Sequence, residues 1–153
     1  MKAYIALGSN ISPRRYHIKR AKELLDKAKG VCIKGCSNLY ETEPVGMESS
    51  RWFLNGVCEV ETALEPLKLM ELLLQIEKEL GRDRSLGMDR EIDLDLLYYD
   101  NQILDVEGLT LPHPRLSERL FVLEPWQEIA PNLVVAPWNK TVSNLYKDLI
   151  EKG

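Results

Sequence analysis

Two acidic residues in an otherwise apolar stretch are the part of the sequence most able to do chemistry. Asp93 and Asp95 flank Leu94 within residues 92–99, which we predict to be a β-strand. Side chains two apart on a strand share a face and lie about 6.6–7 Å apart, so both carboxylates point the same way. Neighbouring negative charges repel, and Mg²⁺, which prefers oxygen ligands, would relieve the repulsion and attract a polyphosphate. The alternative is a solvated acidic face, or a pair neutralised by arginines alone.

Three arginines stand immediately before this strand. Arg82, Arg84 and Arg90 lie in residues 82–91, a polar, glycine-containing stretch that we expect to form a mobile loop. Arginine binds phosphate oxygens through paired N–H groups, so such a loop beside a metal-binding strand suits phosphoryl-type transfer. Acidic residues are interspersed in the loop, so a solvated run of charge is the competing interpretation.

Two further segments could recognise a substrate. His113 lies between Pro112 and Pro114, which would fix the backbone and let the imidazole reach a phosphate. Phe53 and Asn55 share one face of a predicted strand, where a ring beside an amide would suit a flat heterocycle. The alternatives are a structural histidine and an ordinary core aromatic.

The elements that would position these residues follow from hydrophobic periodicity and turn residues. We expect, in order, strand 3–7, a helix from the N-cap Ser12 to Gly30, strands 31–42 and 52–62, a helix from Pro66 to Gly81, and strand 92–99. This β-α-β-β-α-β order predicts a ferredoxin-like α+β fold. The Gly8-Ser9-Asn10 turn is expected to serve strand-to-helix geometry rather than to cradle an anion.

The last third of the chain is expected to add smaller elements to this core. We predict an extended piece near Ile103, a short helix near 118–129 and a final helix that is capped by Thr141 or Ser143. No repeat or linker interrupts the sequence, so residues 1–153 are predicted to form one domain.

Composition limits the classes of partner. The net charge of −4 argues against binding to nucleic acid through a broad basic surface. No apolar run is long enough to suggest a membrane span. The start of the chain lacks the layout of a signal peptide. Three cysteines without a Cys-x-x-Cys pair are expected to be free thiols in a reducing cytoplasm. We therefore expect a cytoplasmic monomer with no nucleic-acid or membrane partner.

Taken in order along the chain, the motifs resemble those of the 6-hydroxymethyl-7,8-dihydropterin pyrophosphokinase family of folate-pathway enzymes. The matching runs are 4–10, 40–46, 53–55, 76–77, 81–84, 90–97, 111–115, 119–125 and 128–131. No single run is decisive, but the ordered combination is specific and covers nearly the whole chain. The resemblance implies a ferredoxin-like fold and the transfer of pyrophosphate from ATP to the hydroxymethyl group of the pterin, with release of AMP.

The resemblance also implies roles for individual residues. Asp93 and Asp95 would hold two Mg²⁺ ions that bridge the ATP phosphates, and with Arg82 and Arg90 they would form the catalytic set. The implied ATP contacts are Arg82, Arg84, Leu96, Thr110, His113 and Arg119. The implied pterin contacts are Thr42, Pro44, Val45, Phe53, Asn55 and Phe121, with the pterin between the two phenylalanine rings.

The chain departs from the family's usual pattern in two places. Many members carry Trp-Gly-Pro-Arg before the Asp-x-Asp strand, where this chain has a run from Gly87 to Arg90 without the tryptophan and proline. Leu74 stands where a glutamine is common. A non-catalytic module that binds ATP and Mg²⁺ on the same fold is therefore the alternative function, whereas an RNA-binding sheet is disfavoured by the negative charge.

Overall fold

The computed structural model describes residues 1–43, 51–81 and 91–152. Its central sheet contains β1 (Lys2–Ser9), β2 (Val31–Cys36), β3 (Tyr40–Thr42), β4 (Phe53–Thr62) and β5 (Asp93–Tyr99). Neighbouring strands are antiparallel and follow the order β2-β4-β1-β5, with β3 also pairing with β4. This order is that of a split βαβ sheet, so the predicted ferredoxin-like α+β fold is confirmed.

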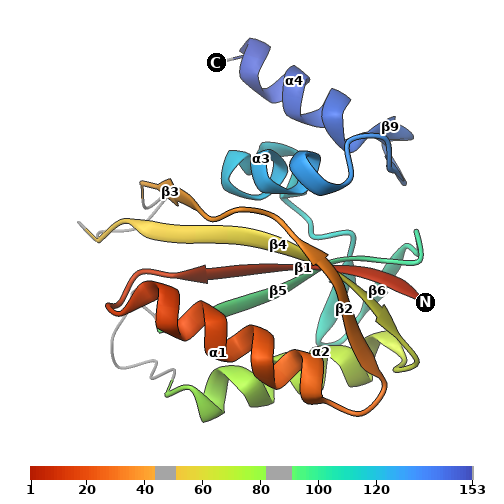
Figure 1. The fold of residues 1–153 in the computed structure, drawn as a ribbon. Coiled ribbons are helices and arrows are strands. Elements are labelled where there is room, and N and C mark those ends of the chain that lie inside the picture. The colour runs from red at the N-terminus through yellow and green to blue at the C-terminus, as the bar shows by residue number, and fades with distance from the viewer. Residues whose placement is uncertain (44–50, 82–90, 153) are drawn as a thin grey trace.

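Helices cover both faces of the sheet, namely α1 (Arg14–Lys27), α2 (Pro66–Glu79), α3 (Leu120–Ile129) and α4 (Val142–Lys152). In Figure 1, α1 and α2 lie below the sheet, whereas α3 and α4 lie above it with α3 nearer the strands. Because side chains alternate along a strand, each face has its own apolar core. The core between the sheet and helices α1 and α2 includes Ile5 and Leu94, and the core between the sheet and α3 includes Tyr4 and Trp126.

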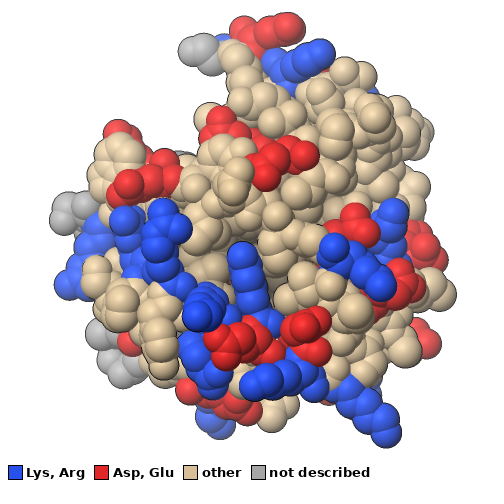
Figure 2. Space-filling view, in the orientation of Figure 1, with Lys and Arg blue, Asp and Glu red and all other residues tan. Residues whose placement is uncertain are grey.

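None of the helices in the described ranges is long and apolar enough to cross a membrane. Figure 2 shows basic and acidic side chains intermingled over α1 and α2 in the same orientation.

A β-bulge in β5 decides which side chains face α3. The pairing with β1 shifts register at this point, so Leu97 is skipped and both Leu97 and Tyr98 belong to the core beneath α3. Before the bulge the strand alternates regularly, with Leu94 in the opposite core. Asp93 and Asp95 therefore project from the α3 face of the sheet.

The predicted strand 31–42 is interrupted, which the sequence pattern does not indicate. Ser37 continues along the same edge of β4 between the two pieces: its N–H donates to the Val57 carbonyl at 2.8 Å, and its Oγ accepts the Val57 N–H at 2.9 Å. Gly56 leaves room for this connection, because a Cβ there would lie 2.9 Å from Leu39 Cδ2. The interruption directs β3 along the start of β4.

The predicted helix boundaries are largely confirmed. α2 begins at Pro66, and Gly81 follows α2 at φ +89°, a left-handed conformation that glycine adopts without steric cost. The prediction of Ser12 as the N-cap of α1 is wrong, because Pro13 occupies that position and no side chain caps the first turn.

The chain after β5 forms two small hairpins and two of the helices. The first hairpin, β6 (Leu104–Val106) and β7 (Leu109–Leu111), adds a partner strand to the extended piece predicted near Ile103. The second hairpin, β8 (Val134–Val135) and β9 (Lys140–Thr141), is a feature that the sequence did not predict. Helix α3 follows a single 3₁₀ turn at Leu116–Glu118.

The final helix was predicted to be capped by Thr141 or Ser143, and the structure shows that Thr141 is the cap. Its Oγ1 accepts the N–H of Asn144 at 3.1 Å, which satisfies one of the free donors at the start of α4.

The prediction of three free cysteines is wrong for two of them. Cys36 and Cys58 form a disulfide, whereas Cys32 is free and exposed. The two bonded residues are direct partners in the β2–β4 register, although 22 positions separate them in the sequence. Antiparallel pairing thus brought together two thiols whose spacing gave no sign of a bond.

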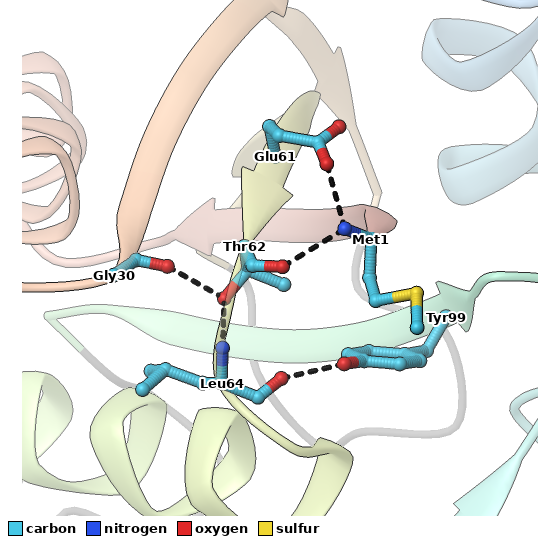
Figure 3. A network of polar contacts seen from close by, with 6 residues as sticks. All are labelled: Met1, Gly30, Glu61, Thr62, Leu64 and Tyr99. Atoms are coloured by element: carbon cyan, nitrogen blue, oxygen red, sulfur yellow. Dashed lines mark hydrogen bonds and ion pairs between the residues drawn. The ribbon is translucent and has the colours of Figure 1, made fainter.

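A polar network joins the strand ends that lie farthest from Asp93 (Figure 3). Thr62 is at its centre: its carbonyl accepts a hydrogen bond from the Met1 nitrogen at 2.9 Å, and its Oγ1 donates to the Gly30 carbonyl at 2.9 Å. The Leu64 N–H donates to the same Oγ1, and Tyr99 Oη donates to the Leu64 carbonyl. This end of the sheet is therefore fixed by contacts among the main elements, and the chemistry-bearing residues gather at the other end.

Candidate active site

At the end of the sheet away from the Thr62 network, three adjacent strands each contribute one residue to a row. Gly8 of β1 pairs with Asn55 of β4 on one side and with Asp93 of β5 on the other. Neighbouring strands are about 4.8 Å apart, so the backbones of Asn55 and Asp93 are separated by roughly 10 Å. The predicted pterin-reading amide and the predicted metal-binding carboxylates therefore share one face and one end of the sheet.

The two carboxylates have the orientation that the sequence predicts. Asp93 and Asp95 are partly exposed, whereas Leu94 and Leu96 beside them are 2% and 3% exposed and belong to the core under α1 and α2. The structure thus confirms that the acidic and apolar residues project from opposite faces of β5.

This donor set fits magnesium. Within the described ranges no group of three or more His, Cys, Asp or Glu side chains gathers as a ready-made metal cage. Mg²⁺ is commonly bound by one or two carboxylates together with water and substrate phosphates. Asp93 and Asp95 supply such carboxylates, and the phosphates would complete the coordination.

Glu77 supports β5 between the two aspartates, although sequence reasoning gave it no role. Its side chain is 3% exposed, and its Oε2 accepts the Leu94 N–H at 2.7 Å. β5 is an edge strand of the sheet. The Leu94 N–H points away from β1, so it donates its hydrogen bond to a side chain of α2 instead of to a neighbouring strand. The match of residues 76–77 to the family motif was the signal that could have identified it.

Replacing Glu77 with alanine is expected to destabilise the protein by about 1–3 kcal/mol, because the buried Leu94 N–H loses its acceptor. The Glu77→Gln variant should lose less, since the amide oxygen can still accept that hydrogen bond. Urea unfolding of the three proteins measures the difference. Equal stability of Glu77→Ala and the unmodified chain would contradict the assigned support.

The predicted pterin-reading amide is held in a defined orientation. Asn55 is 8% exposed, and its Nδ2 donates to Thr42 Oγ1 at 2.5 Å, which fixes the opposite end of the amide, Oδ1. A Cβ on Gly8 would lie 2.6 Å from that Oδ1 and 3.6 Å from Phe53 Cδ1. Gly8 therefore keeps the space beside Asn55 open, a role that sequence reasoning missed. A glycine inside a strand was the available signal, since it often marks a close approach.

The residues after Gly8 serve the geometry of the turn, as expected. Ser9 Oγ donates to the Ile11 carbonyl at 3.4 Å, and Asn10 Nδ2 donates to the Arg51 carbonyl at 3.3 Å. A recess of about 590 Å³ lies beside this turn, lined by Asn10, Ile11, Ser12, Arg14, Glu41, Arg51 and Trp52. Its lining does not include Phe53 or Asn55, so the register of the strands, rather than this recess, defines the candidate site.

A second group of predicted residues meets Asp93 from the C-terminal part of the chain. Partial burial and the positive charge of Arg119 lower the pKa of His113 to about 4, and the charge of Asp93 opposes that shift. The Arg119 guanidinium carbon lies 5.6 Å from the centroid of the Phe121 ring. His113 and Arg119 thus lie within electrostatic range of each other, and the neutral imidazole can accept or donate a hydrogen bond at neutral pH.

The ligand-free protein is expected to lose stability between pH 6.5 and pH 4 because of His113. Its folded-state pKa of about 4 lies below the ordinary value of 6.5, so the unfolded chain binds a proton first as the pH falls. The contribution is complete above pH 6.5 and declines toward pH 4. Denaturant unfolding at several pH values should show a shallower dependence for His113→Gln, and an unchanged slope would contradict the assignment.

The remaining implied ATP contacts divide between main chain and side chain. The Leu96 side chain is in the core, so it cannot contact a nucleotide, and a contact there would come from its main chain. Residues two apart share a strand edge, so the Leu96 N–H points the same way as that of Leu94. Thr110 is exposed on β7, where its Oγ1 bonds Asp105 Oδ1 at 3.4 Å.

Some predicted site residues lie outside the described ranges. These are Pro44, Val45, Arg82, Arg84 and Arg90.

Comparisons with known proteins agree with the resemblance. A family model described as 7,8-dihydro-6-hydroxymethylpterin-pyrophosphokinase (HPPK) matches residues 4–131. The protein named 2-amino-4-hydroxy-6-hydroxymethyldihydropteridine pyrophosphokinase in Bacillus subtilis (strain 168) is 47% identical over 128 residues, which cover 83% of this chain and 77% of that protein. The protein of the same name in Haemophilus influenzae is 36% identical over 150 residues, covering 97% and 93% of the two chains.

A solved structure supports the fold. The crystal structure of Plasmodium falciparum HPPK-DHPS with pteroate aligns with a TM-score of 0.79 over 99% of this chain and 42% of that longer chain. The sequences are 15% identical, so this similarity concerns the fold alone.

The fold, the residues gathered at one end of the sheet and these matches together define an enzyme of the pyrophosphokinase class. The chain belongs to the 7,8-dihydro-6-hydroxymethylpterin-pyrophosphokinase family, which confirms the resemblance of its motifs.

Proposed function

We propose that this chain transfers pyrophosphate from ATP to the hydroxymethyl group of 6-hydroxymethyl-7,8-dihydropterin in folate biosynthesis, with residues 1–153 acting as one catalytic domain. The hydroxymethyl oxygen bonds to the β-phosphorus of ATP while the bond from that phosphorus to the AMP oxygen breaks. The hydroxyl proton is released to solvent, and AMP leaves.

The row Asn55–Gly8–Asp93 is the observation that carries this proposal. A flat heterocycle hydrogen-bonded to the Asn55 amide would lie on the same face and at the same end of the sheet as the carboxylates of β5. The backbones at the two ends of the row are roughly 10 Å apart, so a heterocycle bound at Asn55 and phosphates bound at Asp93 would be close neighbours. Such a reaction depends chiefly on positioning and charge neutralisation, which this arrangement supplies.

Seven of the candidate site residues in the described ranges have a part in this scheme. Phe53 and Phe121 would contact the pterin ring, and Asn55 would read its polar edge. His113 and Arg119 would contact phosphate oxygens beside β5. Mg²⁺ ions held by Asp93 and Asp95, two by the family resemblance, would neutralise charge on the triphosphate.

Incubation with ATP, Mg²⁺ and 6-hydroxymethyl-7,8-dihydropterin tests the proposal. Chromatography should detect AMP and the pterin diphosphate in equal amounts. No AMP above the level of a reaction without pterin would overturn it.

Calorimetry separates the alternative of a non-catalytic module. Tight binding of ATP with Mg²⁺, without pterin binding or AMP release, would favour the module. Pterin binding to the complex of the enzyme with Mg²⁺ and a non-hydrolysable ATP analogue would favour the enzyme.

A further inference from the structure

One carboxylate on α3 holds the connection between β2 and β3. Glu128 accepts the hydroxyl hydrogen of Tyr40 at 2.6 Å, and its two oxygens lie 3.2 and 3.1 Å from the N–H of Asn38. In Figure 2, acidic side chains lie over α3 in the orientation of Figure 1. These contacts join segments about 90 residues apart, so they fix how α3 sits over the sheet edge.

The segment that Glu128 holds leads directly into the candidate pterin site. β3 spans Tyr40–Thr42, and in its register Tyr40 pairs with Asn55 and Thr42 pairs with Phe53. Thr42 Oγ1 accepts the hydrogen bond that orients the Asn55 amide. A strand this short has few ladder hydrogen bonds of its own, so an outside anchor has a large share in fixing its position.

The other end of α3 carries the ring proposed to cover the pterin. Phe121 and Glu128 are seven residues apart, which is nearly two helical turns, so they share a face about 10.5 Å apart along the axis. Phe121 is partly buried against the core beneath α3. The same helix therefore links the Phe121 ring to the anchor on β3, with Pro125 between them removing the helical hydrogen bond to the Phe121 carbonyl, and the anchor helps to fix the separation between that ring and the Phe53–Asn55 wall.

We propose that Glu128 is a positioning residue for the pterin, which sets the width of the slot between Phe121 and the Phe53–Asn55 wall by holding Tyr40 and Asn38. The inference rests on the proposed function and adds a determinant of pterin affinity away from the reacting atoms. The bond to Glu128 is the main cause that raises the pKa of Tyr40 to about 12.

Steady-state kinetics of Glu128→Ala and Tyr40→Phe test the proposal. For Glu128→Ala we expect the KM for the pterin to rise about tenfold, as the loss of charge-assisted hydrogen bonds implies. The KM for ATP and kcat should stay within about twofold, because the phosphate contacts are made elsewhere. Glu128→Gln should recover most of the pterin affinity, since the amide oxygen still accepts the Tyr40 hydroxyl hydrogen.

The same helix supplies matched controls. Glu124 accepts a hydrogen bond from Tyr146 of α4 at 3.1 Å, so its hydrogen bond joins α3 to α4, although both groups lie within electrostatic range of Tyr40. Glu124→Ala and Tyr146→Phe remove an equivalent tyrosine–glutamate bond and should leave the KM for the pterin unchanged. In the double variant Tyr40→Phe/Glu128→Ala, the loss should not exceed that of Glu128→Ala alone by more than about twofold, because both act through one contact.

Several outcomes would overturn the inference. An unchanged pterin KM in Glu128→Ala, an equal rise in the KM for ATP, or an equal rise in the two controls would each do so. Calorimetric pterin binding to the complex with Mg²⁺ and a non-hydrolysable ATP analogue is measured in parallel. If the unmodified chain binds pterin but releases no AMP, the proposed function fails and the binding series still decides the role of Glu128. Absence of pterin binding overturns both.

Discussion

Replacing Asp95 with alanine is expected to abolish pyrophosphate transfer, with a loss on the order of a thousandfold or more in kcat. Asp95 projects from β5 on the same face as Asp93, so its removal leaves one carboxylate where the proposed Mg²⁺ site has two. The fold should remain nearly intact, because the side chain is partly exposed and its loss relieves repulsion between like charges. AMP release and thermal unfolding measure the two effects separately.

Asp100→Asn is the matched control for this variant. Asp100 is exposed just beyond the other end of β5 and has φ +48°, a conformation that asparagine tolerates. The Asp100→Asn substitution removes a carboxylate next to the same strand without changing the candidate site, so the rate of AMP release should be unchanged. Near-normal turnover in Asp95→Ala would contradict the metal assignment.

Adding one methyl group at Gly8 is expected to cost about a hundredfold in kcat/KM for the pterin. The new Cβ would lie 2.6 Å from Asn55 Oδ1, so the amide must turn and weaken its hydrogen bond to Thr42. The obstacle is the end of a side chain, so the fold can adapt, and we expect a small change in Tm. The loss should therefore appear in pterin binding rather than in stability. Steady-state kinetics and calorimetry with pterin measure it.

Gly35→Ala separates this effect from a general effect of glycine replacement in the sheet. Gly35 lies on β2, and a Cβ there would meet no atom within 4 Å, so its activity should equal that of the unmodified chain. Unaltered pterin affinity in Gly8→Ala would show that the space beside Asn55 is not used by the substrate.

Much of this architecture could be predicted because local patterns and tertiary packing agree. The alternation around Asp93 and Asp95 predicted their common face, and Pro66 and Gly81 predicted the limits of α2. The Thr141 cap was also indicated locally. In each case the physical cause acts over a few neighbouring residues: side-chain alternation, fixed proline φ or a left-handed glycine.

Apart from the N-cap of α1, the main errors occur where distant segments meet. The disulfide between Cys36 and Cys58 depends on the register of β2 with β4. The break between β2 and β3 depends on the contacts of Ser37 with Val57 and on the close packing of Leu39 against Gly56. Neither pairing has a local sequence signature.

The sequence by itself determined the chemistry that the protein brings: two carboxylates on one strand face, a histidine between prolines, and a ring beside an amide on another strand. The ordered motifs also determined its family. The tertiary structure alone decided that Asn55, Gly8 and Asp93 stand in one row and that Glu77 and Glu128 support the strands beside them. Strand register and helix docking bring residues together across tens of positions, and they are set by the packing of the whole chain rather than by any one segment.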